Sequence, residues 1–111
     1  MTILQTVATG SGAIDASHVA PTGQHYQLLS VALHLSAAPT TSENLTVTLN
    51  SMHGAEYDAR LYTVDPSATS LTDLYWTPDA DTWLAPGDAV DVHYANTDAR
   101  VYGLTITVQG V

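Results

Sequence analysis

Apolar and polar residues alternate with a period of two along most of this chain, and neither face has the three-to-four-residue repeat of an amphipathic helix. Such alternation predicts strands that bury one face. Eight segments follow it: 3–9, 24–36, 44–51, 56–64, 71–76, 82–84, 89–95 and 100–109. Turn sequences rich in Gly, Pro, Asn and Asp separate them. We therefore expect an all-β protein with no significant helix.

The inward positions can be assigned from the alternation. In the last segment an apolar set, Tyr102, Leu104, Ile106 and Val108, alternates with Gly103, Thr105 and Thr107. In the longest segment one face holds Leu29, Val31, Leu33 and Leu35, and the opposite face holds Tyr26, Leu28, Ser30, Ala32 and His34. Because the second face is mixed, we expect it to be half wet or packed against another element.

About eight short strands separated by regular turns are typical of a sandwich or a barrel. Long crossing loops favour an antiparallel, jelly-roll-like β-sandwich over an immunoglobulin-like one, and the Cys…Trp…Cys core of immunoglobulin domains is absent. We divide the chain into an N-terminal strand or arm, 1–20, and a β-sandwich domain, 21–111. The arm contains a small, flexible Gly/Ser segment at 9–13, so its strand pairs either with its own domain or with a neighbouring subunit.

The net charge of the chain limits the kinds of partner that it is expected to bind. Eleven Asp and Glu residues face two Arg and no Lys, for a net charge of -9. Phosphate contacts need cationic side chains, so neither nucleic acid nor an anionic membrane surface is an expected partner. No apolar stretch reaches the length of a membrane span. The first residues lack the basic and continuous apolar regions of a secretory signal, so we expect synthesis in the cytoplasm without export by that route.

The residues that could act in catalysis or bind a metal ion do not form a recognisable motif. The five histidines, His18, His25, His34, His53 and His93, form no pair at metal-ligand spacing, and the chain has no cysteine. An acidic set, Asp79, Asp81, Asp88 and Asp91, supplies oxygens without a calcium-loop pattern, and turn aspartates commonly bond their own backbone. A triad drawn from Ser30, His34 and Asp91 lacks a nucleophile elbow. We expect no catalytic residues, no cofactor and no metal, and hence no enzyme.

Aromatic residues near carboxylates give the one candidate ligand surface. Tyr75, Trp76 and Trp83 stand close in sequence to Asp79 and Asp81. An exposed aromatic plane with polar neighbours is what a sugar-binding face needs. The alternative, which we favour, is that both tryptophans are core residues at one end of the sandwich.

Several strand and turn sequences look familiar together. They are YQLLSVALHLSAAPTTSENLT (26–46), LAPGDAVDV (84–92), YANTD (94–98) and YGLTI (102–106). In these segments the chain resembles small β-sandwich structural proteins of tailed bacteriophages, of the capsid decoration or cement type. The resemblance covers most of the chain after residue 20 and carries over no catalytic residue.

The resemblance implies a non-enzymatic virion protein on the capsid exterior, where it binds the major capsid protein or another virion protein. It also implies a homo-oligomer such as a trimer, and a lysine-free protein has a physical reason to cover its sheet edges by assembly. The alternative is a carbohydrate- or receptor-binding module of a phage tail or fibre.

Overall fold

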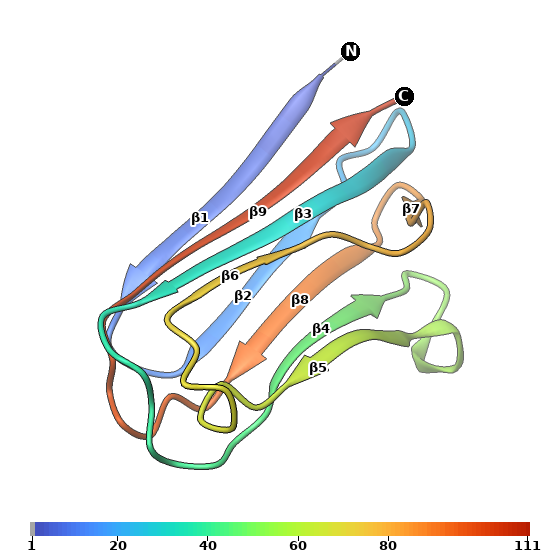
Figure 1. Cartoon of the computed structure of the whole chain (residues 1–111). Helices are drawn as coiled ribbons and strands as arrows, with labels where there is room; N and C mark the ends of the chain where they lie inside the picture. The colour runs from blue at the N-terminus through green and yellow to red at the C-terminus, as the bar shows by residue number, and fades with distance from the viewer. Residues whose placement is uncertain (1) are drawn as a thin grey trace.

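The computed structural model describes residues 2–111 as two antiparallel sheets packed face to face (Figure 1). The five-stranded sheet contains, in spatial order, β1 (Ile3–Gly10), β9 (Tyr102–Gly110), β3 (Tyr26–Leu35) and β6 (Asp73–Trp76), and β7 (Trp83–Leu84) also pairs with β3. The four-stranded sheet contains β2 (Ile14–Val19), β8 (Ala89–Tyr94), β4 (Leu45–Asn50) and β5 (Ala59–Val64). Helix in this part of the chain is limited to one 3-10 turn, η1 (Ala55–Tyr57). The predicted all-β sandwich is confirmed.

The strand order is that of a jelly roll. Apart from the two-residue β7, the sheets read β1-β9-β3-β6 and β2-β8-β4-β5. The chain thus crosses between sheets after β1, β2, β3, β5, β7 and β8, and its first and last strands are neighbours. Two sheets of four strands connected in this way make the double Greek key of jelly rolls.

The core lies between the sheets and follows the predicted alternation in β8 and β9. Tyr102, Leu104, Ile106 and Val108 are buried, as are Val90, Val92 and Tyr94 on β8. On β4, the strand beside β8, Leu45 and Val47 are fully buried as well. Each such aliphatic side chain contributes about 1.5 to 3 kcal/mol by leaving water. These positions decide which face of each strand turns inward.

A bulge corrects the predicted faces of β3. The pairing of β3 with β9 shifts register between Leu28 and Ser30, so one residue of β3 is extra. Tyr26 and Leu28 are buried before the bulge, and Val31, Leu33 and Leu35 are buried after it, whereas Leu29 is half-buried. The assignment of Leu29 to the buried face, and of Tyr26 and Leu28 to the opposite one, was wrong. A bulge adds one residue and therefore reverses the alternation beyond it.

The strand β2 was missing from the prediction of eight strands. Its residues Ile14 and His18 are buried, while Asp15 and Ser17 point outward. With Asp, Ser and His among six residues, its alternation of hydrophobicity is weak. Backbone hydrogen bonds to β8 make this segment a strand, although its sequence has no clear strand pattern.

The N-terminal segment 1–20 supplies one strand to each sheet in this single chain. β1 pairs with β9, and β2 pairs with β8. The two strands lie on the same side of the sandwich, where Thr6 Oγ1 is 2.8 Å from Nδ1 of His18. Burial lowers the pKa of His18 because it disfavours the charged imidazolium.

Candidate functional site

The outer faces of the two sheets differ in character. On the four-stranded sheet the outward side chains include Asp15, Arg60, Asp91 and His93. Asp91 accepts hydrogen bonds from Ser17 Oγ at 2.6 Å and from Asn50 Nδ2 at 3.1 Å. His93 Nδ1 lies 3.7 Å from Asp15 Oδ1. This is the polar outer face expected of a half-solvated antiparallel sheet.

The outer face of the five-stranded sheet is mostly uncharged. Four large hydrophobic side chains on it are exposed: Ile3 by 50%, Val7 by 71%, Tyr75 by 73% and Trp83 by 47%. We call this surface the neutral face, and strand registers assign to it Ile3, Gln5, Val7, Thr9, Gln27, Ala32, His34, Asp73, Tyr75, Trp83, Gly103, Thr105, Thr107 and Gln109. Among them Asp73 is the one carboxylate, His34 is the one histidine, and none is a lysine or an arginine.

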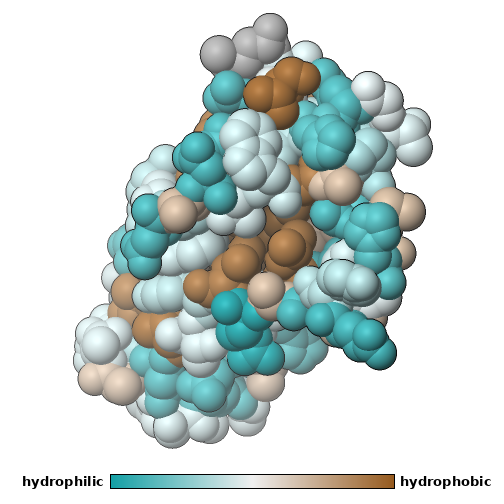
Figure 2. All heavy atoms as spheres, turned by 90° about the vertical axis from the view of Figure 1, so that its right-hand side faces the viewer, coloured by the Kyte–Doolittle hydropathy of each residue, from teal (hydrophilic) through white to brown (hydrophobic). Residues whose placement is uncertain are grey.

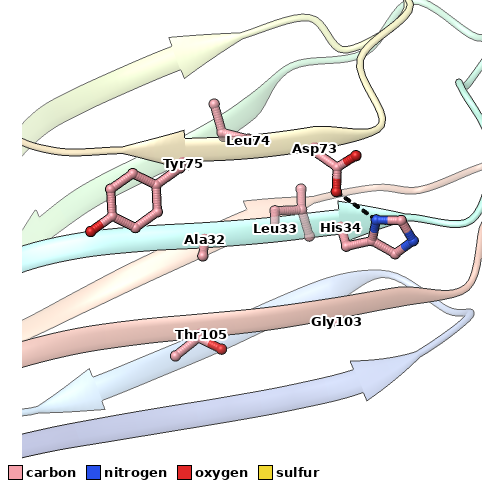
Figure 3. A pocket seen from close by; sticks show the side chains of 8 residues that line it. All are labelled: Ala32, Leu33, His34, Asp73, Leu74, Tyr75, Gly103 and Thr105. Carbon is pink, nitrogen blue, oxygen red and sulfur yellow. Dashed lines mark hydrogen bonds and ion pairs between the residues drawn. The ribbon is translucent and has the colours of Figure 1, made fainter.

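An open hollow of about 540 Å³ lies on the neutral face across β6, β3 and β9. Ala32, Gly103 and Thr105 form its floor (Figure 3). Tyr75 lies at one end, and the hydrogen-bonded pair of His34 and Asp73 lies at the other, with Nδ1 to Oδ1 at 2.6 Å. The hydrogen bond from His34 lowers the pKa of Asp73. The hollow therefore combines an aromatic ring with exposed hydrogen-bonding groups.

Gly103 keeps this hollow open. A Cβ added to Gly103 would meet nothing within 4 Å, and its φ lies outside the positive range that favours glycine. Its pairing with Thr9 and His34 is regular, so no bulge or bend explains it. Glycine inside a strand weakens it and often marks a place where a ligand or another backbone approaches. The fold by itself does not require a glycine here.

The five residues predicted as a ligand surface do not form one site. Tyr75 and Trp83 lie on the neutral face, and Asp81 accepts a hydrogen bond from Gln27 Nε2 at 3.0 Å beside Trp83. Trp76 instead points inward, where its half-buried ring stacks on Tyr62 with centroids 5.3 Å apart.

Asp79 lies with Trp76 at a second hollow of about 380 Å³ that is lined by residues of β5, β6 and the chain after β6. β5 and β6 are the edge strands farthest from β2 and β1 in their sheets, so this hollow lies on the side of the sandwich away from β1 and β2. Figure 2 shows hydrophobic atoms reaching the surface between polar ones on the side of the molecule that is at the right in Figure 1. The predicted surface is thus divided between two sides of the sandwich.

The catalytic and metal candidates are likewise separated. Ser30 and His34 lie on β3, whereas Asp91 lies on β8 in the other sheet. Asp88 is buried, and its carboxylate accepts the N–H groups of Met52 and Ala85, both at 2.9 Å. Within residues 2–111 no three or more His, Asp or Glu side chains are grouped so that they could hold a metal ion. No helix described by the structure is long and apolar enough to span a membrane.

A cluster of turn residues that the sequence analysis did not single out connects the loops at one end. Asp98 Oδ2 accepts the N–H groups of Thr40 at 2.7 Å and Thr41 at 2.9 Å, and Oδ1 accepts the Thr41 hydroxyl at 2.8 Å. The hydrogen bonds from Thr41 and Thr40 lower the pKa of Asp98 from 3.8 to about 2. Glu43 binds Thr97 in the same way. The carboxylates of Asp98 and Glu43 thus hold the loops together by hydrogen bonds.

Comparison with known proteins identifies no relative, since no protein-family profile matches the chain and no curated protein matches it.

Proposed function

We propose that this chain is a non-enzymatic structural protein of a tailed-phage virion that binds the outer capsid surface as a homo-oligomer. The class of particle is suggested by the resemblance to capsid decoration proteins in the segments 26–46, 84–92, 94–98 and 102–106. The partner is the major capsid protein or another virion protein.

The neutral face is the observation that carries the proposal. Within a chain of net charge -9, this face gathers four of the large exposed hydrophobic side chains, and it includes one carboxylate, Asp73. Large hydrophobic side chains exposed on one face with few charges favour a protein interaction site there. Docking at this face removes few charged groups from water. Tyrosine and tryptophan, both present here, are enriched among the residues that contribute most to binding energy. The outer face of the opposite sheet carries two carboxylates, Asp15 and Asp91, together with Arg60 and His93.

Capsid binding tests the proposal directly. Capsids that lack this protein are mixed with the purified chain and sedimented, and the bound fraction is measured over a concentration series. We expect the double variant Tyr75→Ala with Trp83→Ala to bind at least about tenfold more weakly, since one hot-spot truncation costs on the order of 2 kcal/mol. The matched control, Asn50→Ala with His93→Ala, changes two outward residues of the other sheet and should bind as wild type. Absence of binding, or equal loss in both double variants, would contradict the proposal.

The hollow around Gly103 favours a second candidate function, a carbohydrate- or receptor-binding module of a tail or fibre. The exposed Tyr75 ring would stack on the apolar face of a sugar, while His34, Asp73 and Thr105 would bond its hydroxyl groups. A negatively charged chain favours a neutral sugar over an anionic one.

A glycan array separates the two functions. Binding of a neutral glycan by the wild type, with loss in Gly103→Val, would favour the module, because valine fills the open space above the floor. The circular dichroism of the variant should match that of the wild type. Binding to capsids with no glycan retained would favour decoration.

A further inference from the structure

Apart from the two-residue β7, which pairs only with β3, four strands form the edges of the two sheets, and one of them is chemically unlike the others. β1 and β6 bound the five-stranded sheet, and β2 and β5 bound the four-stranded sheet. Edge strands offer unpaired backbone groups to other chains unless charged residues, proline or bulges blunt them. β2 carries Asp15, β5 carries Arg60 and β6 carries Asp73. β1, eight residues long with the sequence ILQTVATG, carries no charge and no proline.

The unpaired backbone groups of β1 can be identified from its register. The N–H of Gly110 donates to the carbonyl of Thr2 at 2.7 Å, which makes these residues a hydrogen-bonded pair. Such pairs alternate along an antiparallel ladder. The even-numbered residues of β1 therefore bond to β9, and Ile3, Gln5, Val7 and Thr9 direct their N–H and C=O groups away from it. In the part of the chain that the structure describes, β1 pairs with no strand other than β9.

The outward groups match a second copy of the same strand. When two β1 strands run antiparallel with Thr6 opposite Thr6, Ile3 faces Thr9 and Gln5 faces Val7 on both sides of the two-fold axis. All four outward residues of each strand then lie in hydrogen-bonded pairs. A register shifted by two residues leaves at least one of them without a partner inside the strand. The two-fold register is thus the one that satisfies the whole edge.

We infer that β1 pairs with β1 of a second copy of this chain, about a two-fold axis at Thr6. This inference rests on the homo-oligomer in the proposed function and names its contact surface. Two chains of charge -9 repel each other, so the contact that costs least lies on an uncharged segment. Residues that face each other in a ladder point to the same side of the sheet. The pairing therefore joins the two neutral faces and places Ile3 and Val7 next to the second copy.

Proline substitutions can test the backbone N–H groups of β1 that point away from β9 separately from those that bond to β9. Val7→Pro removes an N–H that points away from β9, which an edge strand tolerates. Its matched control, Ala8→Pro, removes an N–H of the β1–β9 ladder and should lower the melting temperature. In sedimentation velocity at micromolar concentration we expect the wild type to be an oligomer with an even number of copies. We expect Val7→Pro to have half that mass or less, with unchanged circular dichroism.

Cysteine cross-linking tests the register and does not depend on the folding of a proline variant. The chain has no cysteine of its own. Across a non-hydrogen-bonded pair the Cα atoms lie about 4.5 Å apart, within the roughly 4.4 to 6.8 Å that a disulfide spans. Thr6→Cys should therefore form a covalent dimer on mild oxidation. Ile3→Cys, at the same edge, should not, because two Ile3 residues lie about 20 Å apart in this register.

The possible outcomes distinguish the inference from the proposed function. A monomeric or trimeric wild type, an unchanged mass for folded Val7→Pro, or cross-linking of Ile3→Cys but not Thr6→Cys would overturn the inference. Capsid binding by that same protein would leave the proposed function intact. An even-numbered oligomer that is cross-linked through Thr6→Cys but binds no capsid would support the strand pairing and overturn the proposed function.

Discussion

Asn96 is the residue whose replacement tests the structure most sharply. It is buried, with an exposure of 3%, and takes a left-handed backbone conformation with φ of 51°. Its Nδ2 donates to the carbonyls of Gly12 at 2.9 Å and Arg100 at 3.0 Å, and its Oδ1 accepts the N–H of Arg100 at 3.1 Å. One side chain thus connects the loop between β1 and β2 to the turn between β8 and β9.

The expected loss of stability follows from these contacts. Asn96→Ala removes the three hydrogen bonds named above, each worth about 1 kcal/mol net, together with a longer one of 3.4 Å to the carbonyl of Ser11, and leaves their backbone partners unsatisfied. Alanine in the left-handed region adds about 1 to 2 kcal/mol, whereas asparagine adopts it more readily. We expect a total loss of about 4 kcal/mol, a large part of the roughly 5 to 15 kcal/mol that stabilises a domain. Asn96→Gly loses the same bonds without the backbone strain, so its loss should be about 3 kcal/mol.

Urea unfolding followed by tryptophan fluorescence measures both variants. With a slope of about 2 kcal/mol per molar urea, Asn96→Ala should move the midpoint down by roughly 2 M and Asn96→Gly by somewhat less. Asn44→Ala, at an exposed position, is the control and should stay within about 0.5 kcal/mol of wild type. A loss below about 1 kcal/mol for Asn96→Ala, or a glycine variant less stable than the alanine variant, would refute this reasoning.

Three further predictions concern the core, the loops and the hollow. Ile106→Ala should lose about 2 to 5 kcal/mol in urea unfolding because its fully buried side chain leaves a cavity, and a loss under about 1 kcal/mol would contradict the sandwich core. The pKa of Asp98 is lowered from 3.8 to about 2, so its contribution is complete above the unfolded value and is lost as pH falls through the folded one. Acid titration should therefore show a shallower loss of stability between those values in Asp98→Asn than in wild type. Gly103→Ala should keep or raise the melting temperature, since its Cβ meets open space; a clear drop would show that the fold needs this glycine.

Strong alternation made the core strands predictable from the chain. In β8 and β9 every inward position except Gly110, the last residue of β9, is a large apolar residue, so hydrophobic burial alone selects the face and the register. The turns between the strands were also predicted, because Gly, Pro, Asn and Asp adopt turn conformations locally. By contrast, β2 pairs with β8 through its backbone, and the bulge in β3 depends on β9, so neither leaves a clear local pattern.

The candidate site was predictable only in part, for a geometrical reason. We favoured a core position for both tryptophans, which was wrong for Trp83, since it is exposed by 47% on the neutral face. Trp76 does turn inward onto Tyr62, away from Tyr75, because neighbouring residues of a strand face opposite sides. The hollow joins Tyr75 on β6 to Ala32 on β3 and Gly103 on β9, three strands that only the jelly-roll topology makes adjacent. The order of residues thus determined which side chains the regular strands β8 and β9 bury, since burial in them is repeated every second residue. Pairing between distant strands decided which exposed side chains share a surface, because that depends on topology and register rather than on neighbours in the chain.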